Sequence, residues 1–338
     1  MDATVQEILQ ATLDGYLKRH RVVWWIERAA WALRWCRTAM MGSHARVCPE
    51  GHVREVHYNS CAHRACPQCS WGRMEEWLKA KHRQLLGCDH YHLVVTLPDV
   101  FRPLWQFNQR RFIGLLFRTS LEVVQELMAE RYGVRPGVLA SLHTWTRTLV
   151  AHPHLHCLVT GGGLTPEGEW RPVRRDFLLP GAQVGARLCH RLCDRVKRWL
   201  EQGRLELPLG LTPEQALKRI QRTRRKKWVV HIQPPYRHGR GVAIYLARYA
   251  RGGPVKNHQI LAFDGHTVRF RYKESSKDGS RRRWREMTLR VEEFLRRLLL
   301  HVPPPGLQVV RGYGLYAHNQ RQALESARRQ TGSLPEEA

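Results

Sequence analysis

The sequence predicts a mixed α+β protein with a helical, cysteine-rich N-terminal part. Apolar residues recur at roughly helical spacing over residues 1–40. Residues 44–70 have little apolar periodicity and are rich in Cys and His. Further along, short apolar runs typical of buried strands, such as 91–97 and 155–160, alternate with longer helical patterns. Together these observations indicate helices and strands combined in one chain.

The elements after the cysteine-rich stretch are placed from breaker and turn residues. Pro98 ends the strand over 91–97, and the glycines at 161–163 end the strand over 155–160. Asp264-Gly265 predicts a hairpin between two further strands. The remaining expected elements are helices over 71–86, 103–130, 183–203, 213–222, 290–300 and 316–329, and strands over 138–150, 228–232, 258–263 and 266–272.

The charge of the chain indicates a polyanionic partner. Lys and Arg number 56 against 29 Asp and Glu among 338 residues, a formal net charge of +27. Such an excess favours nucleic acid or an anionic membrane surface. No run approaches the roughly 18 apolar residues of a membrane span, and the N-terminus lacks a signal-peptide core. We therefore expect a cytosolic protein without a membrane partner, whose cysteines are reduced.

Soft metal ligands crowd into one short segment, at Cys48, His52, Cys61, Cys66 and Cys69. Cys66 and Cys69 have the spacing of a zinc-ribbon knuckle. The first knuckle is unusual because Cys48 and His52 are four residues apart, and Cys61 could replace either. We expect four of these five residues to bind a structural Zn²⁺, which would supply folding free energy to a segment with too little core. The alternative is a set of buried free cysteines.

His154-Leu155-His156 lies in the apolar run over 155–160 and the turn before it. Residues two apart in a strand point the same way, so the two imidazoles share one face. They could hold a divalent metal on a phosphate, although packed histidines and metal-dependent hydrolases of small substrates show the same pattern.

Tyr245 and Tyr249 lie one turn apart on an expected helix from about 241 to 249, which Gly252-Gly253-Pro254 ends. Residues at i and i+4 share a helix face, and two such aromatics are usually core residues. Combined with the histidine pair and the net charge, however, they indicate a nuclease in which a tyrosine attacks the phosphate and becomes covalently bonded to DNA.

The chain resembles the two-tyrosine, rolling-circle transposases of the insertion sequence 91 family, which contain a His-hydrophobic-His (HUH) strand. The resemblance covers nearly the whole length. The matching stretches are YNSCAHRACPQC, YHLVVTLP, LHTWTRTLVAHPHLHCLVTGGGL, IYLARY and RGYGLYAH. The chain departs from the family at CPEGH, residues 48–52, where the family has CxxCG, and this departure bears on the zinc ligand set.

The resemblance implies a mostly antiparallel sheet with helices on one side, the ferredoxin-like or RRM-like core of HUH nucleases. It divides the chain into a basic helical region over 1–43, a zinc module over 44–72, an endonuclease domain over 73–330 and a tail over 331–338.

The resemblance also implies a role for each site residue. His154 and His156 would hold Mg²⁺ or Mn²⁺ against the scissile phosphate. Tyr245 would attack to give a 5′-phosphotyrosine, and Tyr249 would serve the second strand transfer. As the third metal ligand we expect His143 on the preceding strand, with His152 in the turn as the alternative.

Basic runs suit single-stranded DNA, since cations contact phosphates and aromatics such as Trp284 stack on bases. The alternative is a solvated charged face. The residues we expect to contact DNA are Arg224, Arg225, Lys226, Lys227, Arg248, Arg251, Arg281, Arg282 and Arg283.

The expected function is therefore DNA transposition through single-strand cleavage at transposon ends and target, in the bacterial cytoplasm at the nucleoid. No Walker A motif appears, so we expect a host helicase to unwind DNA. Two alternatives are a zinc-ribbon nucleic-acid-binding protein without catalysis and a metallohydrolase that uses the histidine pair. The sequence leaves the oligomeric state and the recognised DNA sequences open.

Overall fold

The structure is a computed structural model, and it describes residues 3–70, 75–76, 79–80, 82–173, 178–226, 228, 230–236, 253–275 and 282–332. The chain divides into two compact units. Unit 1 comprises residues 1–76, 145–151 and 251–305, and unit 2 comprises 77–144, 152–250 and 306–338. Unit 1 therefore combines the N-terminal residues with residues 251–305. The domain boundaries expected from the sequence had placed that segment in the endonuclease domain.

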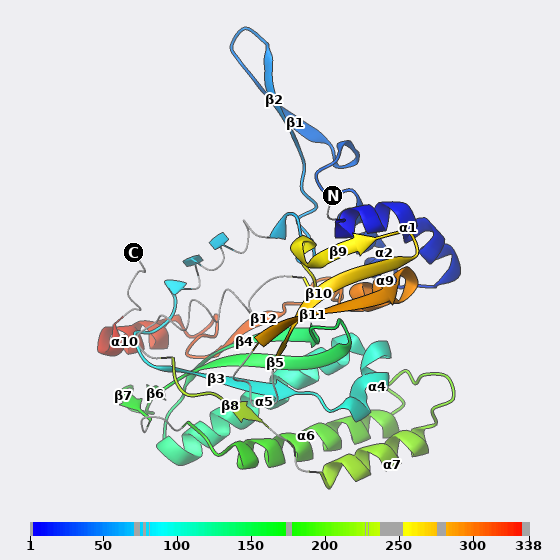
Figure 1. Ribbon diagram of the computed structural model, residues 1–338. Helices are drawn as coiled ribbons and strands as arrows, with labels where there is room; N and C mark the ends of the chain where they lie inside the picture. The colour runs from blue at the N-terminus through cyan, green and yellow to red at the C-terminus, as the bar shows by residue number, and fades with distance from the viewer. Residues whose placement is uncertain are drawn as a thin grey trace. The chain divides into compact units, whose positions relative to one another are not determined.

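Unit 1 is built from helices on a small antiparallel sheet, with strand order β11-β10-β9 (Figure 1). Its core is formed by apolar side chains from both, among them Leu9, Leu13, Phe270 and Phe294. Its main elements are α1 (Val5–Arg19), α2 (Trp24–Arg34), η1 (Ala39–Met41), η3 (Asn257–Gln259), β9 (Ile260–Phe263), β10 (Thr267–Ser275), β11 (Arg282–Arg290) and α9 (Val291–Leu300).

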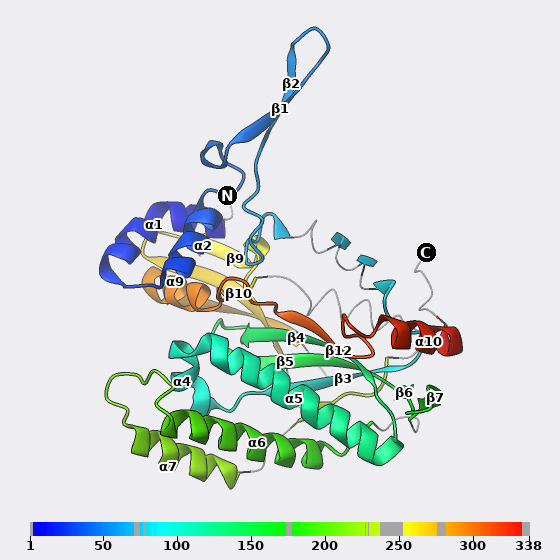
Figure 2. The same ribbon diagram turned by 180° about the vertical axis from the view of Figure 1, so that it is seen from behind.

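Two hairpins belong to unit 1. The predicted hairpin over Asp264-Gly265 is confirmed as β9–β10, and the Asp264 carboxylate accepts hydrogen bonds from the backbone N–H groups of His266 and Thr267 at 2.8 and 2.6 Å. The second hairpin, β1 (Ser43–Val47) and β2 (Val53–Tyr58), is exposed along both strands and projects as a long ribbon (Figure 2). Hydrophobic burial therefore contributes little to this ribbon.

Unit 2 contains a five-stranded sheet with the order β12-β4-β5-β3-β8. Its strands are β3 (His90–Thr96), β4 (Gly137–Trp145), β5 (Ala151–Thr160), β8 (His231–Ile232) and β12 (Val310–Gly314). β3 pairs antiparallel with both β5 and β8, and β12 pairs antiparallel with β4. The strands expected over 91–97 and 155–160 are thus neighbours, and β8 covers the last two residues of the strand expected over 228–232.

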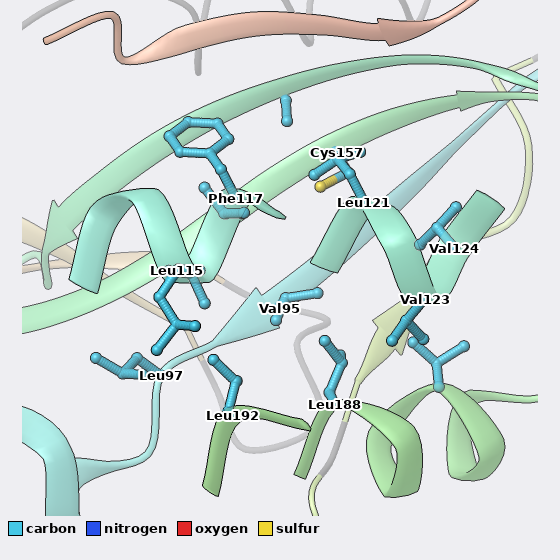
Figure 3. Packing of buried hydrophobic residues seen from close by; sticks show 14 of the residues in the cluster. Val95, Leu97, Leu115, Phe117, Leu121, Val123, Val124, Cys157, Leu188 and Leu192 are labelled. Carbon is cyan, nitrogen blue, oxygen red and sulfur yellow. The ribbon is translucent and has the colours of Figure 1, made fainter. Parts of the chain in front are cut away.

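Helices cover one face of this sheet, as expected, with α5 (Gln109–Tyr132) and α6 (Gly181–Glu201) packed against it (Figure 1). Figure 3 shows their apolar side chains, such as Leu121 and Leu188, facing Val95 and Cys157 of the sheet. The helix expected over 103–130 is instead two helices, since α4 (Arg102–Phe107) ends at a buried Asn108.

The break at Asn108 has a local cause. Its side-chain amide donates hydrogen bonds to the carbonyls of Leu104 and Glu206 at 2.9 and 2.8 Å, and its side-chain oxygen accepts from the Glu206 N–H at 3.0 Å. Asn side chains that bond to the backbone compete with the helix. The other elements of unit 2 are η2 (Asp99–Phe101), β6 (Gly162–Leu164), β7 (Trp170–Pro172), α7 (Pro213–Arg224) and α10 (Arg321–Thr331).

Among the described helices, none is both long and apolar enough to cross a bilayer.

Candidate active site and metal centres

Three histidines meet on the sheet of unit 2. His154 and His156 lie on β5, and His143 lies on the neighbouring strand β4. One ring nitrogen from each lies within 4.8 Å of the others. The intervening Leu155 and the following Cys157 belong to the core under the helices, so the strand alternation turns His154 and His156 to the opposite face.

The rings of this histidine cluster converge closely. His154 Nε2 lies 3.0 Å from His156 Nε2, and the His143 ring centroid lies 4.7 Å from that of His156 and 5.6 Å from that of His154. Two nitrogens on adjacent positions of an octahedral ion, each roughly 2.1 Å from it, would lie about 3.0 Å apart. The spacing therefore fits a shared divalent cation.

Neighbouring groups orient two of the three rings. His154 Nδ1 lies 2.6 Å from the backbone carbonyl of His152, and a carbonyl only accepts, so Nδ1 of His154 donates. In a neutral ring this leaves Nε2 bare and available to a metal. His156 Nδ1 lies 2.9 Å from His92 Nε2 on β3. His92 thus orients His156 as the His152 carbonyl orients His154, and the sequence reasoning missed it.

Burial favours the neutral form of His154, His156 and His92. It lowers the pKa of His154 and of His92 to about 4 each. Burial, followed by the neighbouring His143, lowers the pKa of His156 further still. Neutral imidazoles are the form that binds metal. Among the described residues, no carboxylate joins the three histidines in a metal-sized group.

The structure thus groups His143 with the histidine pair and leaves the His152 side chain out of the group, whereas its carbonyl holds His154. The strand order explains this placement, because β4 carries position 143 and lies beside β5 in the sheet. Metal ligation itself remains a prediction.

Several predicted site residues lie outside the residues that the structure describes. These are Tyr245, Tyr249, Lys227, Arg248, Arg251 and Arg281. The backbone of Arg282 is described within β11, but its side chain is not.

The described basic residues differ in their surroundings. Arg224 forms an ion pair with Asp194 at 2.8 Å and contacts His190 at 2.9 Å, so it is at least partly structural. Arg225, Lys226 and Arg283 are exposed. Beside Arg283, the exposed Trp284 carries Arg271 and Lys273 over its ring at 4.8 and 5.0 Å. Such a cation–aromatic surface suits nucleic-acid binding.

A second metal-ligating cluster lies in unit 1, where Cys36, Cys61, Cys66 and Cys69 bring their sulfur atoms within 4.8 Å of one another. Cys61 Sγ and Cys69 Sγ are 3.6 Å apart. Four thiolates that hold Zn²⁺ tetrahedrally at about 2.3 Å lie roughly 3.8 Å apart, so this donor set fits a structural zinc ion. We call it the four-cysteine cluster.

Hydrogen bonds link the thiols of the four-cysteine cluster. The Cys61 thiol donates to Cys66, which lowers the pKa of Cys66 to about 5 and raises that of Cys61. Burial raises the pKa of Cys36 to about 12, and Cys36 Sγ accepts from the Cys61 N–H at 3.4 Å. Binding of Zn²⁺ would release the thiol protons of the ligands.

The expected ligand set of four among Cys48, His52, Cys61, Cys66 and Cys69 is not brought together. Cys48 and His52 lie with Glu50 in the turn of the β1–β2 hairpin, with Cys48 Sγ 3.4 Å from His52 Nδ1. Cys36 takes the fourth place in the cluster. It comes from the turn after α2, outside the segment 44–72 to which the spacing rule was applied. The only signal available in the sequence was one further cysteine ahead of the Cys- and His-rich segment.

Comparisons with known families agree along the chain. A family model described as “Putative transposase” matches residues 137–323. A second, described as “Transposase zinc-binding domain”, matches residues 8–97, a range that includes the whole four-cysteine cluster.

Two curated proteins are similar over most of their length. “Putative transposase y4qJ” of Sinorhizobium fredii (strain NBRC 101917 / NGR234) is 32% identical over 94% of this chain and 81% of its own length. “Transposase for insertion sequence element IS801” of Pseudomonas savastanoi pv. phaseolicola is 30% identical over 84% of this chain and 68% of its own length. No solved structure matches the chain.

Proposed function

The chain belongs to the “Putative transposase” family, among the transposases of the insertion sequence 91 type, and on that premise we propose that it transposes DNA by cutting and rejoining single strands through phosphotyrosine intermediates. The observation that carries the proposal is the histidine cluster: three imidazoles converge on the face of the sheet opposite the helices, and hydrogen bonds orient His154 and His156. Donors fixed on strands hold a reacting phosphate more accurately than donors on loops.

In this proposal His154 and His156, with His143 as the third ligand, hold Mg²⁺ or Mn²⁺. When bound, the ion polarises the scissile phosphate as a Lewis acid. The chain's own contribution is to keep His154 and His156 neutral by burial and to fix their orientation through the His152 carbonyl and His92. The imidazoles therefore keep the same orientation for each phosphate that binds.

Tyr245 is the proposed nucleophile. Its hydroxyl oxygen forms a bond to the phosphorus, and the bond from phosphorus to the 3′ oxygen breaks. The phenol loses its proton, and the released 3′ oxygen takes up one proton to become a hydroxyl. The DNA then carries a 5′-phosphotyrosine, and the reverse reaction with another 3′-hydroxyl rejoins a strand. Tyr249, one turn further along the predicted helix, would serve the second transfer.

DNA binding completes the proposal. Arg225, Lys226 and Arg283 are exposed cations in the described part of the chain, and Trp284 offers a stacking surface. We propose the other predicted contacts, at Arg224, Lys227, Arg248, Arg251, Arg281 and Arg282, on the basis of charge alone. A DNA substrate would place the protein at the bacterial nucleoid, with a host helicase supplying the unwound strand.

A covalent adduct assay tests the proposal. Purified protein is incubated with single-stranded DNA that carries the transposon end and Mn²⁺, and adducts that survive SDS are digested and mapped by mass spectrometry. We expect the adduct on Tyr245, its loss in Tyr245→Phe, and its persistence in Tyr249→Phe with strand transfer blocked. Tyr58→Phe, an exposed tyrosine on β2, is the matched control.

Two results would contradict the proposal. An adduct in the Tyr245→Phe/Tyr249→Phe double variant would exclude the two-tyrosine mechanism. Tight DNA binding without any adduct in the unaltered protein would favour the non-catalytic zinc-ribbon alternative.

A further inference from the structure

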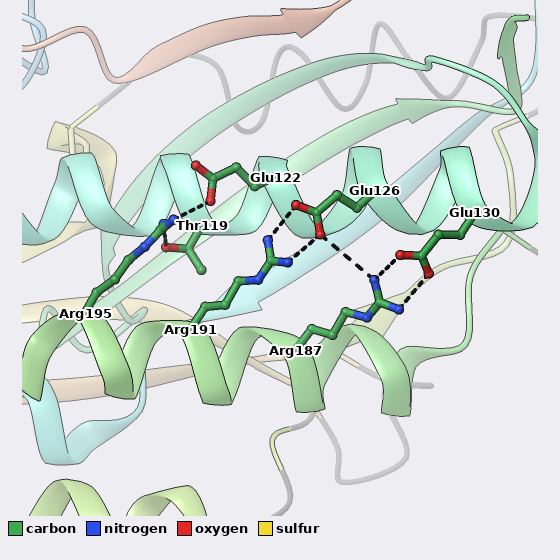
Figure 4. A network of polar contacts seen from close by, with 7 residues as sticks. All are labelled: Thr119, Glu122, Glu126, Glu130, Arg187, Arg191 and Arg195. Atoms are coloured by element: carbon green, nitrogen blue, oxygen red, sulfur yellow. Dashed lines mark hydrogen bonds and ion pairs between the residues drawn. The ribbon is translucent and has the colours of Figure 1, made fainter.

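The two helices that cover the sheet of unit 2 are joined by a ladder of ion pairs (Figure 4). Arginines four residues apart on α6 face glutamates four residues apart on α5, as expected for antiparallel helices. The pairs are Arg187 with Glu130 at 2.6 Å, Arg191 with Glu126 at 2.5 Å, and Arg195 with Glu122 at 2.7 Å. Positive and negative charges balance along this half of the helix pair.

The balance ends one rung further on. Continuing along the same stripe of α5 in steps of four, Glu122 is followed by Arg118, Gly114 and Arg110. On α6 the next position after Arg195 is Trp199. The stripe on α5 therefore changes from acidic to basic, and the next position of the facing stripe on α6 carries no acidic residue to pair with these arginines.

A groove of about 550 Å³ lies at this end of the two helices. Six arginines line it: Arg110, Arg111, Arg118, Arg195, Arg198 and Arg204. No acidic side chain is among the described residues that line it. We call it the arginine groove.

The arginine groove has a shaped floor. Trp199 lines it and packs edge-on against Phe112, with ring centroids 6.1 Å apart. Arg195 is held at its edge by Thr119 and Glu122 at 2.8 and 2.7 Å. Gly114 lies between the arginines of α5, and a Cβ there would meet open space. Except for Arg195, the lining arginines are exposed.

Gathering like charges costs free energy unless an anion neutralises them. Guanidinium forks match phosphate oxygens in pairs, and a row of cations matches a polymer of phosphates better than a single small anion. The arginine groove therefore has the chemistry of a site for a phosphodiester backbone.

The groove and the histidine cluster use opposite sides of the sheet. α5 and α6 pack on Cys157 and the other core residues of β5, whereas His154 and His156 point to the other face because side chains alternate along the strand. A phosphate held at the histidines is thus a different one from those held in the groove.

We propose that the arginine groove binds the backbone of a second DNA segment, without reading its sequence, while the histidine cluster engages the strand that is cut. The identification of the polymer as DNA rests on the proposed function. No residue that we assign to cleavage lies in the groove, so the two can be tested separately.

The test compares two charge-reversal variants with the same change in net charge. Arg118→Glu/Arg198→Glu alters the arginine groove, and Arg321→Glu/Arg329→Glu alters exposed positions on α10. The affinity for a duplex of arbitrary sequence is measured over a range of salt concentrations. We expect the groove variant to bind at least about tenfold more weakly, with a salt slope lower by about two, and the α10 variant to change by less than about threefold.

A third variant blocks the groove without removing an arginine. Gly114→Glu adds a carboxylate in open space, so α5 should keep its fold, as circular dichroism would confirm, and duplex affinity should fall as well. Adduct formation on a short single strand that spans only the cleavage site should be unchanged in all of these proteins.

Equal losses in the groove and α10 variants would overturn the proposal, because only net charge would then matter. The proposal would also be overturned if the groove variants kept their affinity for the duplex but lost affinity for tripolyphosphate. The groove would then be a site for small anions. If the unaltered protein formed no adduct but the groove variants still lost duplex binding, the cleavage mechanism would fail and the groove would stand.

Discussion

The four-cysteine cluster and the histidine cluster are both sets of side chains suited to metal binding, but they lie on different kinds of backbone. Cys36, Cys61, Cys66 and Cys69 lie in turns and irregular backbone, where the chain supplies little regular hydrogen bonding. The histidines lie on adjacent strands of a sheet whose other face is packed against helices.

This difference separates the two roles that a metal can have in one chain. In unit 1 the ion would hold its surroundings together, since Cys36 must converge with three ligands that begin 25 residues further along the chain. In unit 2 the convergence is already produced by strand pairing and by the hydrogen bonds of the His152 carbonyl and His92. Losing the first ion should unfold structure, and losing the second should only stop chemistry.

The largest expected effect is on the four-cysteine cluster. Cys66→Ser should lose bound zinc and destabilise unit 1 by several kcal/mol, since structural zinc contributes about 10–16 kcal/mol of apparent binding free energy in small domains. Metal analysis and hydrogen exchange of α1 and β10 measure this. Cys48→Ser, in the β1–β2 turn, is the matched control and should keep the zinc. Full zinc content in Cys66→Ser would show that the four-cysteine cluster does not hold the zinc ion.

The next effect is on cleavage. His156→Ala should slow single-strand cleavage by on the order of a thousandfold, equivalent to about 4 kcal/mol of transition-state stabilisation, with zinc content and unfolding unchanged. A cleavage assay beside a gel-shift assay measures it, and His318→Ala, an exposed histidine of unit 2, is the control. Normal cleavage in His156→Ala would mean that the cluster is structural.

An acid titration probes unit 1 away from both clusters. Burial lowers the pKa of His301 to about 4, below its unfolded value near 6.5, and its Nε2–H donates to the Leu149 carbonyl at 3.0 Å. The folded state therefore binds fewer protons than the unfolded state between these values. The contribution of His301 to the free energy of unfolding is fully present above about pH 6.5. It falls as the pH drops towards 4, by up to about 3 kcal/mol.

His301→Gln can still donate to that carbonyl but does not titrate. Its free energy of unfolding should vary less between pH 6.5 and 4 than that of the unaltered protein, as urea unfolding at several pH values would show. The same slope in both proteins would assign the acid sensitivity to other groups.

The smallest effect is the most specific. His92→Ala should weaken Mn²⁺ binding by about 10–100-fold, the usual cost of losing a group that orients a ligand. His92→Gln, whose carbonyl oxygen can accept from Nδ1–H of His156, should recover part of the affinity. Paramagnetic resonance of bound Mn²⁺ measures both. Equal affinity in all three proteins would show that His92 merely packs beside the site.

The histidine cluster was predictable because its geometry follows from strand period and strand order. His154 and His156 had to share a face, and His143 had to lie on the strand that pairs beside them. His92 was missed because it lies 64 residues before His156, and only the β3–β5 register brings the two together. A histidine near the start of an apolar strand gives no sign of such a partner.

The cysteine ligand set was less predictable for the same reason. Local spacing identified Cys61, Cys66 and Cys69, whereas Cys36 joins them through the fold of α2 and the turn after it. The break of the long helix at Asn108 likewise depends on a bond to Glu206, which no local pattern reveals. The arginine groove is visible only once α5 and α6 are aligned, although the change from Glu to Arg along α5 can be read from the sequence.

The most direct measurement of the central claim follows adduct formation and metal content together. Protein that has been purified with its zinc is treated with EDTA under conditions that remove only weakly held ions, then supplied with single-stranded DNA and increasing Mn²⁺. We expect no SDS-stable adduct after chelation, unchanged zinc content and unfolding midpoint, and recovery of the adduct as Mn²⁺ is added. An adduct that persists without a divalent ion, or whose loss follows the loss of zinc, would contradict it.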